Sequence, residues 1–249
     1  MTLRHLLFFA SALALVSLVA WLARQQPSTG DPVLSSAGPP SLAAQPAPGP
    51  VPSPAAPVVS GPAVAAVDAG WVRRTAAAAG VPEPAVAAYA RAVLGAPKSC
   101  GLGWTTLAGI GWVESQHGTI GGRTVSADGR PSTPILGPAL DGAGSVAAIR
   151  ASAAGTLLHG DPEWDHAVGP LQFLPSTWAT WARDGDGDGV ADPQDLDDAA
   201  AAAAAYLCGT GQDLTTGPGW SAAVYAYNHS ATYVQSVYVA ATTYATRSG

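Results

Sequence analysis

The residue best suited to chemistry is Glu114, which lies in the apolar segment from Trp104 to His117. The chain has only two other glutamates, Glu83 and Glu163, although aspartates are plentiful. A carboxyl group buried among apolar side chains should have a raised pKa, because burial disfavours its charged form. It would then hold a proton near neutral pH for delivery to a leaving oxygen, as a general acid does. The neighbours expected to bury it are Leu107, Ile110, Trp112 and Val113. The alternative is a glutamate on the wet face of an amphipathic helix.

A second group of residues has the spacing of a calcium-binding loop. Oxygen ligands recur at positions 1, 3, 5, 9 and 12 of a 12-residue loop, with glycine at position 6 and a backbone carbonyl at position 7, as in an EF-hand. Like charges this close would repel one another without a cation, so we expect a structural Ca²⁺ here, with a solvated acidic turn as the alternative. The predicted ligands are Asp184, Asp186, Asp188, Val190 through its carbonyl, Asp192 and Asp195.

The formal net charge of -6 comes almost entirely from the aspartates between residues 184 and 198. The excess negative charge therefore belongs to one site and not to the chain as a whole. It does not indicate a nucleic-acid partner, because no basic patch accompanies it.

Two further segments are rich in aromatic and amide side chains. One runs from Trp164 to Trp178 and contains Gln172 after a Gly-Pro turn, and the other runs from Val224 to Tyr233. Taken alone, each is most simply core packing. Taken with Glu114, they offer flat apolar faces for sugar rings and polar groups for N-acetyl and ring oxygens.

These segments, in this order, resemble the lytic murein transglycosylases of the membrane-bound B type, especially the actinobacterial ones. The resemblance covers about residues 68–244, and Leu171 departs from the more usual Met, a swap that conserves volume. It implies a mainly α, lysozyme-like transglycosylase domain with an EF-hand-like calcium loop, and peptidoglycan glycan strands as the substrate. It implies catalysis by Glu114 and substrate binding by Ser115, Gln172, Tyr227, Asn228 and Tyr233.

The resemblance also implies a mechanism with one acid. Glu114 would protonate the bond between MurNAc and GlcNAc and then deprotonate the C6 hydroxyl, which gives 1,6-anhydroMurNAc. Glycosidases that use two carboxylates need a second one within about 5–10 Å of the acid. No such partner is evident, although residues in the loop region could approach: Asp128, Asp141, Glu163 and Asp165.

Three other functions stay open. A hydrolytic muramidase would use Glu114 together with Asp165 or Glu163. A non-catalytic peptidoglycan-binding module would need the groove and not Glu114. A zinc peptidase has no support from helical HExxH spacing, and it would draw its ligands from His159, Asp161, His166 and His229.

The chain divides into three parts by composition. Residues 1–24 contain an apolar run from Leu6 to Ala23 that suits a signal peptide or a membrane anchor. Residues 25–67 form a Pro/Ala-rich linker that is expected to be disordered. Residues 68–249 are the expected catalytic domain, a monomer with no organic cofactor, placed outside the cytoplasm in the cell wall or on the membrane.

Cys100 and Cys208 are the only cysteines. In an exported chain they most simply form one disulfide, with two buried free thiols as the alternative.

The helical pattern predicts how these residues are positioned. Asp68 should cap a helix through Ala79, with Gly80 as its stop. A long loop region from Thr119 to about Asp165, here called the excursion, is faintly helical only at Val146 to Ala154. The other predicted helices are Glu83 to Leu94, Trp104 to His117, Ser176 to Arg183, Leu196 to Cys208, Gly219 to Tyr227 and Thr232 to Thr246.

Overall fold

The structure is a computed structural model that describes residues 46, 49, 51–52, 54, 64–144 and 146–249. The expected signal peptide or anchor at residues 1–24 and most of the expected linker at 25–67 lie outside the described residues. No helix within the described ranges is long and apolar enough to cross a bilayer.

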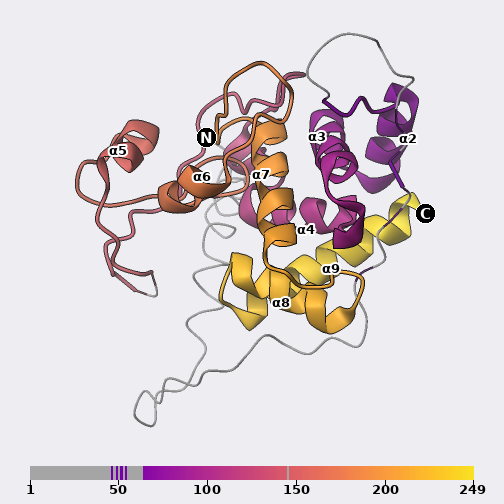
Figure 1. Ribbon diagram of the computed structural model, residues 1–249. Helices are drawn as coiled ribbons and strands as arrows, with labels where there is room; N and C mark the ends of the chain where they lie inside the picture. Colours follow the sequence, from indigo (N-terminus) through magenta and orange to yellow (C-terminus); the bar gives the residue numbers. More distant parts are fainter. Residues whose placement is uncertain (1–45, 47–48, 50, 53, 55–63, 145) are drawn as a thin grey trace, which may run out of the picture.

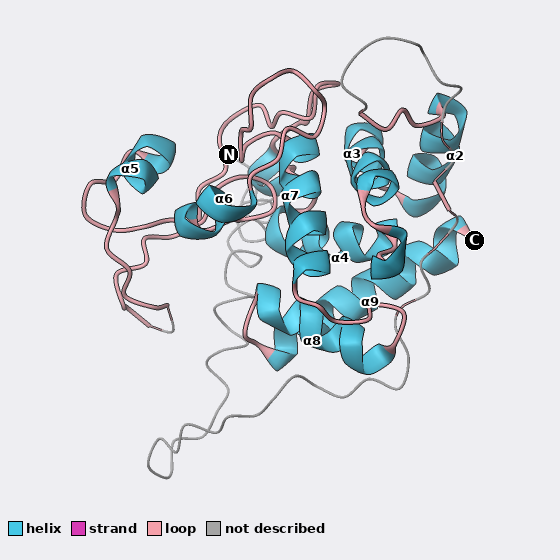
Figure 2. Ribbon diagram, viewed as in Figure 1, coloured by secondary structure: helices cyan, strands magenta, loops and turns pink. Residues whose placement is uncertain are grey.

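The described part of the chain is helical, as predicted (Figures 1 and 2). Within these ranges, β pairing is limited to isolated bridges such as the one between Leu136 and Val168. The elements are α2 (Ala69–Ala79), α3 (Glu83–Gly95), η2 (Lys98–Cys100), α4 (Trp104–Ser115), η3 (Ile120–Gly122), α5 (Ala153–His159), α6 (Pro175–Trp181), α7 (Leu196–Gly209), α8 (Gly217–Tyr227) and α9 (Ala231–Ser248).

Helix α4 lies at the centre of the helical body and packs most extensively against α9 (Figure 1). Its residues from Trp104 to Gly111 are all buried, so this part of the helix is enclosed on every side rather than amphipathic. Gly109 permits the close approach, since a Cβ there would lie 2.8 Å from the carbonyl oxygen of Val237 on α9. The last turn of α4, which carries Glu114, is thereby fixed against α9.

The helix ends follow local signals in most places. The Asp68 carboxylate accepts a hydrogen bond from the Trp71 N–H at 2.7 Å, and Gly80 ends α2 in the left-handed conformation with φ 72°, both as predicted. Ser230 caps α9 by accepting from the Tyr233 N–H. This cap places Tyr233 in the first turn of α9.

Several predicted helix boundaries differ from the structure, and α6, for example, ends at Trp181 rather than at Arg183. Helix α4 ends at Ser115 rather than at His117, because Gln116 and His117 adopt left-handed backbone angles with φ 54° and 61°. The helix predicted over Val146 to Ala154 is absent, and α5 begins instead at Ala153 after the cap residue Ser152. The Ser152 hydroxyl accepts from the Gly155 N–H at 3.0 Å, a capping signal that the sequence did carry.

The excursion between α4 and α6 has few helical residues but is held by backbone hydrogen bonds. Leu140 N–H donates to the Asp165 carbonyl at 2.9 Å, and Ile149 N–H donates to the Leu140 carbonyl at 2.8 Å. In Figure 1 the part of this segment that carries α5 projects on the left and away from α4 and α9.

The predicted disulfide is present, and it joins Cys100 to Cys208 with their Cα atoms 5.4 Å apart. It links η2, just before α4, to the last turn of α7.

Candidate active site

Glu114 lies in the last turn of α4, where its side chain is partly accessible to solvent. Burial by the surrounding protein raises the pKa of its carboxyl group to about 7, against the lowering effect of a hydrogen bond from Tyr233. The raised pKa was predicted. The predicted surroundings were wrong in part, because Trp112 is 47% exposed rather than packed over the carboxyl group.

Tyr233 is the direct partner of Glu114. Its side chain is buried, and its hydroxyl donates to Glu114 Oε1 at 2.6 Å. Tyr227 stacks on the Tyr233 ring, with centroids 6.5 Å apart and planes only 6° from parallel. The Tyr227 hydroxyl donates in turn to the Leu171 carbonyl at 2.8 Å. The structure thus brings together three segments that are far apart in the sequence.

Gln172 lies beside this group in a left-handed backbone conformation with φ 51°. Its side-chain amide donates to the Gly169 carbonyl at 2.8 Å. Position 169 admits only glycine, since a Cβ there would lie 1.7 Å from the carbonyl oxygen of Pro193. The tight turn at Gly169 therefore fixes the amide of Gln172.

Two grooves are lined by residues close in sequence to members of this group, although Glu114 and Tyr233 line neither of them. One of about 210 Å³ is lined by Gln172, Tyr227 and neighbouring residues of α6 and α8. The other, of about 610 Å³, is lined by Val113 and Thr232, each next in sequence to a member of the pair, and by further residues of α9.

Ser115 and Asn228 are placed differently from the other predicted site residues. Ser115 is fully buried, and its hydroxyl donates to the Pro170 carbonyl at 2.6 Å and accepts from the Gly118 N–H at 2.8 Å. The Ser115 hydroxyl is thus engaged within the protein, and its expected contact with the substrate stays a prediction. The hydroxyl joins the end of α4 to the Gly-Pro turn. Asn228 lies exposed at the end of α8.

The aspartate loop brings only some of its predicted ligands together. Carboxylate oxygens of Asp184, Asp186 and Asp188 all lie within 4.8 Å of one another, and such oxygens suit a hard divalent cation. Asp192 and Asp195 instead face the guanidinium of Arg130, which approaches Asp195 to 3.5 Å. The Val190 backbone belongs to the exposed part of the loop.

Arg130 is a participant that the sequence reasoning missed. It comes from the excursion and contacts Asp192, Asp195 and, at 3.9 Å, Asp188. The excess of negative charge in the loop was the signal for such a partner, but nothing in the spacing indicated which cation would fill the role.

The histidines of the excursion are paired with aspartates rather than arranged around a metal. His159 Nε2 lies 2.8 Å from Asp165 Oδ1, and His166 Nε2 lies 3.1 Å from Asp161 Oδ2. His229 is elsewhere, exposed beside Tyr225. Among the described residues, only Asp184, Asp186 and Asp188 form a cluster with metal-binding geometry. The geometry thus gives no support to a zinc peptidase.

The carboxylates considered as a second catalytic group also form hydrogen bonds or ion pairs with other protein groups. Asp165 is buried against His159, and the exposed Glu163 accepts from Arg150 at 2.9 Å. Asp128 and Asp141 are exposed and accept hydrogen bonds within their own turns. The influences on the pKa of Glu114 are burial and Tyr233, and no second carboxylate is among them.

Residues 156–225 match the Transglycosylase SLT domain family. The matched part contains Gln172 and the aspartate loop, and it begins after Glu114. No curated protein sequence matches the chain.

Two solved structures are similar, both of the Escherichia coli lytic transglycosylase Slt35. One is its complex with bulgecin A, with a TM-score of 0.44, and the other is its complex with calcium, with a TM-score of 0.43. Each is 16% identical and covers 71% of this chain and 78% of that chain. At this identity and these TM-scores, the two likenesses are not evidence of a shared activity.

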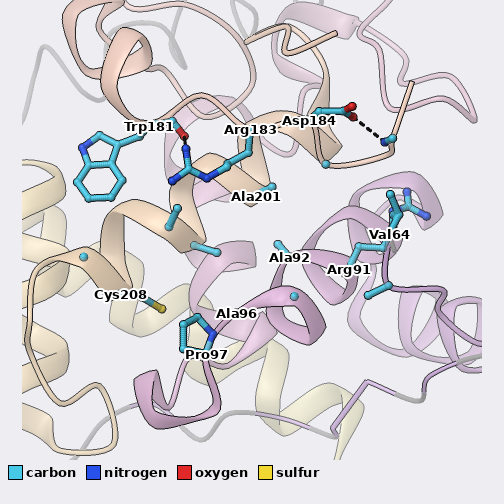
Figure 3. A pocket seen from close by; sticks show the side chains of 17 residues that line it. Val64, Arg91, Ala92, Ala96, Pro97, Trp181, Arg183, Asp184, Ala201 and Cys208 are labelled. Atoms are coloured by element: carbon cyan, nitrogen blue, oxygen red, sulfur yellow. Dashed lines mark hydrogen bonds between the residues drawn. The ribbon is translucent and has the colours of Figure 1, made fainter. Parts of the chain in front are cut away.

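A cavity of about 650 Å³ lies elsewhere (Figure 3). It is bounded by α3, α7, the end of α6 and the start of the aspartate loop, with Trp181, Arg183 and Asp184 on its rim. Neither Glu114 nor its tyrosine partners line it. This cavity therefore does not mark the candidate active site, which the perturbed carboxyl group of Glu114 locates.

The hydrogen bond from Tyr233 can be tested through the titration of Glu114. Because this bond lowers the pKa of Glu114, Tyr233→Phe should raise that pKa above about 7. Glu114 must be protonated to act as an acid, so the alkaline limb of the pH dependence of kcat/KM should move to higher pH. Tyr225→Phe, on α8, is the matched control and should leave the limb in place. A limb unmoved in Tyr233→Phe would contradict the assignment.

Proposed function

We propose that this protein is a peptidoglycan lytic transglycosylase. It cleaves the β-1,4 bond between MurNAc and GlcNAc and forms 1,6-anhydroMurNAc, with Glu114 as the only acid and base. The observation that carries the proposal is a single, partly accessible carboxyl group whose pKa is about 7, held by Tyr233 and without a second carboxylate acting on it. The Transglycosylase SLT domain match at residues 156–225 supports the same reaction class.

A pKa near neutrality suits a group that must first give a proton and then take one. Protonated Glu114 donates to the glycosidic oxygen as the bond to C1 breaks, and the N-acetyl group of MurNAc stabilises the charge at C1. The carboxylate then removes the proton from the C6 hydroxyl, whose oxygen bonds to C1. Tyr233 holds Oε1, which leaves Oε2 to carry the proton.

The proposed substrate-binding residues are those of the sequence motifs. Gln172 and Tyr227 line the smaller groove and offer an amide and an aromatic face to a sugar ring. Asn228 would contribute from the rim. The sequence resemblance supports the proposal of a lysozyme-like domain of the membrane-bound B type, of the actinobacterial kind. The apolar run in residues 1–24 supports the proposal of a monomer that acts outside the cytoplasm and is anchored through these residues if they are not removed.

Digestion of purified peptidoglycan separates this proposal from a binding module. The purified protein should release soluble fragments, whereas a binding module would sediment with the sacculi and release nothing. A muramidase would also release fragments, but it would lose activity on Asp165→Asn or Glu163→Gln. These two variants should retain the activity of the wild type, and a loss of several orders of magnitude in either would favour hydrolysis.

We also propose that the aspartate loop binds Ca²⁺ in a structural role. Asp184, Asp186 and Asp188 would hold the ion, and Val190, Asp192 and Asp195 complete the EF-hand spacing. Bound calcium would replace water and neutralise the loop where it leads into α7, whose cap is Asp195. No step of the reaction passes through it.

Calcium should raise the Tm, because a ligand that binds only the folded state stabilises it. At one hundred times its Kd the contribution is about 2.7 kcal/mol. The measurement is thermal unfolding in calcium and in chelator, with Asp184→Asn/Asp186→Asn as the variant that should lose the difference. Magnesium at equal concentration is the control for ionic strength. Equal Tm values in calcium and in chelator would contradict the proposal that the aspartate loop binds Ca²⁺.

A further inference from the structure

The residues directly after Glu114 and Ser115 form a strained turn. Gln116, His117 and Gly118 all have positive φ, of 54°, 61° and 86°. Left-handed angles at a non-glycine residue with a bulky side chain are costly and persist only where the surroundings enforce them. Here the His117 N–H donates to the Gly111 carbonyl at 2.8 Å, which closes the end of α4.

The ring of His117 is buried between two tyrosine hydroxyls from different helices. Nδ1 lies 3.1 Å from the Tyr89 hydroxyl of α3, and Nε2 lies 2.9 Å from the Tyr244 hydroxyl of α9. Burial lowers the pKa of His117 to about 3, so the ring is neutral and has one donor and one acceptor nitrogen for the two hydroxyls. Burial also raises the pKa of Tyr89 and that of Tyr244, so both hydroxyls keep their protons.

Two contacts therefore fasten α9 to the end of α4. Tyr233 binds Glu114 and Tyr244 binds His117. The two tyrosines are three turns apart on one face of α9, about 16 Å along its axis, yet they converge on residues only three positions apart. The absence of a side chain at Gly111 leaves room for Tyr89 of α3, since a Cβ at this position would lie 2.0 Å from the Tyr89 hydroxyl oxygen.

We propose that His117 is a positioning residue for the pair formed by Glu114 and Tyr233. Its ring ties α3 and α9 to the turn that follows Glu114, and this keeps the Tyr233 hydroxyl on the carboxyl group. The catalytic consequence rests on the proposed function, whereas the effect on the carboxyl group does not. The groups that face Glu114 are Tyr233 of α9 and Tyr227 of α8, and those that face His117 are Tyr89 and Tyr244.

The test follows Glu114 directly by NMR of isotope-labelled glutamate carboxyl groups. With Glu83 and Glu163 as the other glutamates, only three carboxyl signals are expected. In His117→Phe the hydrogen bond from Tyr233 should loosen, and the pKa of Glu114 should rise. Tyr244→Phe removes one hydroxyl and keeps the ring, so it gives the same direction of change in a protein less prone to unfold.

Two further variants separate positioning from general stability. Thr106 lies on α4 at a distance from Glu114, and its hydroxyl accepts a buried hydrogen bond of 3.0 Å from the indole N–H of Trp220. Thr106→Val removes this bond, so it should lower the Tm and leave the pKa of Glu114 unchanged. His117→Asn keeps a residue that tolerates left-handed angles but is too short to reach both hydroxyls, so it should behave like His117→Phe.

In glycan cleavage we expect kcat to fall by about 10- to 100-fold in His117→Phe with KM little changed, the size of effect that a small displacement produces. A Tm that falls in His117→Phe, Tyr244→Phe and His117→Asn while the pKa of Glu114 stays at the wild-type value would overturn the proposal. If the pKa moves but the wild-type protein cleaves no glycan, the positioning role stands and the proposed function fails.

Discussion

Glu114→Gln is expected to lower the rate of glycan cleavage by at least about 100-fold and to leave the fold intact. The amide keeps the shape of the side chain but can neither donate nor then accept the proton, and general acid–base catalysis contributes about 10²–10⁴-fold. Release of soluble fragments from sacculi measures the loss. Glu83→Gln, in the first turn of α3, is the matched control and should retain the activity of the wild type.

Glu114→Gln should not lower the thermal stability of the protein at about pH 8. The pKa of Glu114 is raised on folding from 4.5 to about 7, so the wild-type protein loses stability as pH rises through that range. Glu114→Gln removes this loss, and its Tm at about pH 8 should equal or exceed that of the wild type. A variant that keeps a tenth of the wild-type rate, or that unfolds at about pH 8, would contradict the assignment of Glu114.

Removal of the disulfide should have the largest effect on stability. Cys100 and Cys208 are 108 residues apart in sequence, and closing a loop of this length stabilises a fold by about 4.7 kcal/mol on the chain-entropy estimate. Cys100→Ser/Cys208→Ser should therefore unfold at a much lower denaturant concentration. At low temperature it should still cleave glycan, because neither cysteine contacts the Glu114 group.

Reduction of the wild-type protein provides the control for that measurement. It should produce the same loss of stability as the double substitution, since both remove only the crosslink. A loss below about 1 kcal/mol in both would show that the bridge does not hold the η2 end of α4 to α7.

The main parts of the candidate site were predictable from the sequence because each depends on short-range signals. Glu114 is identified by its rarity and its apolar surroundings, and Gln172, Tyr227 and Tyr233 by motifs with fixed spacing. Helix ends with a cap residue and a glycine, such as Asp68 and Gly80, were equally clear. These signals need no knowledge of which distant segments meet.

The features that were missed depend on contacts between distant segments. Ser115 is enclosed at the end of α4, where its hydroxyl donates a hydrogen bond to the carbonyl of Pro170, 55 positions away. Arg130 is drawn to the aspartate loop from a segment without regular structure. His117 follows three polar residues in the sequence, and its burial between Tyr89 of α3 and Tyr244 of α9 depends on segments far away in the chain.

The most direct test of the one-carboxylate reaction is the mass of the products released from unmodified glycan strands in isotopically labelled water. A transglycosylase closes the ring with the C6 hydroxyl of the substrate, so we expect 1,6-anhydroMurNAc ends, one water lighter than hydrolytic ends and free of solvent oxygen. Reducing-end MurNAc that carries the labelled oxygen as the main product would contradict the mechanism and indicate a muramidase.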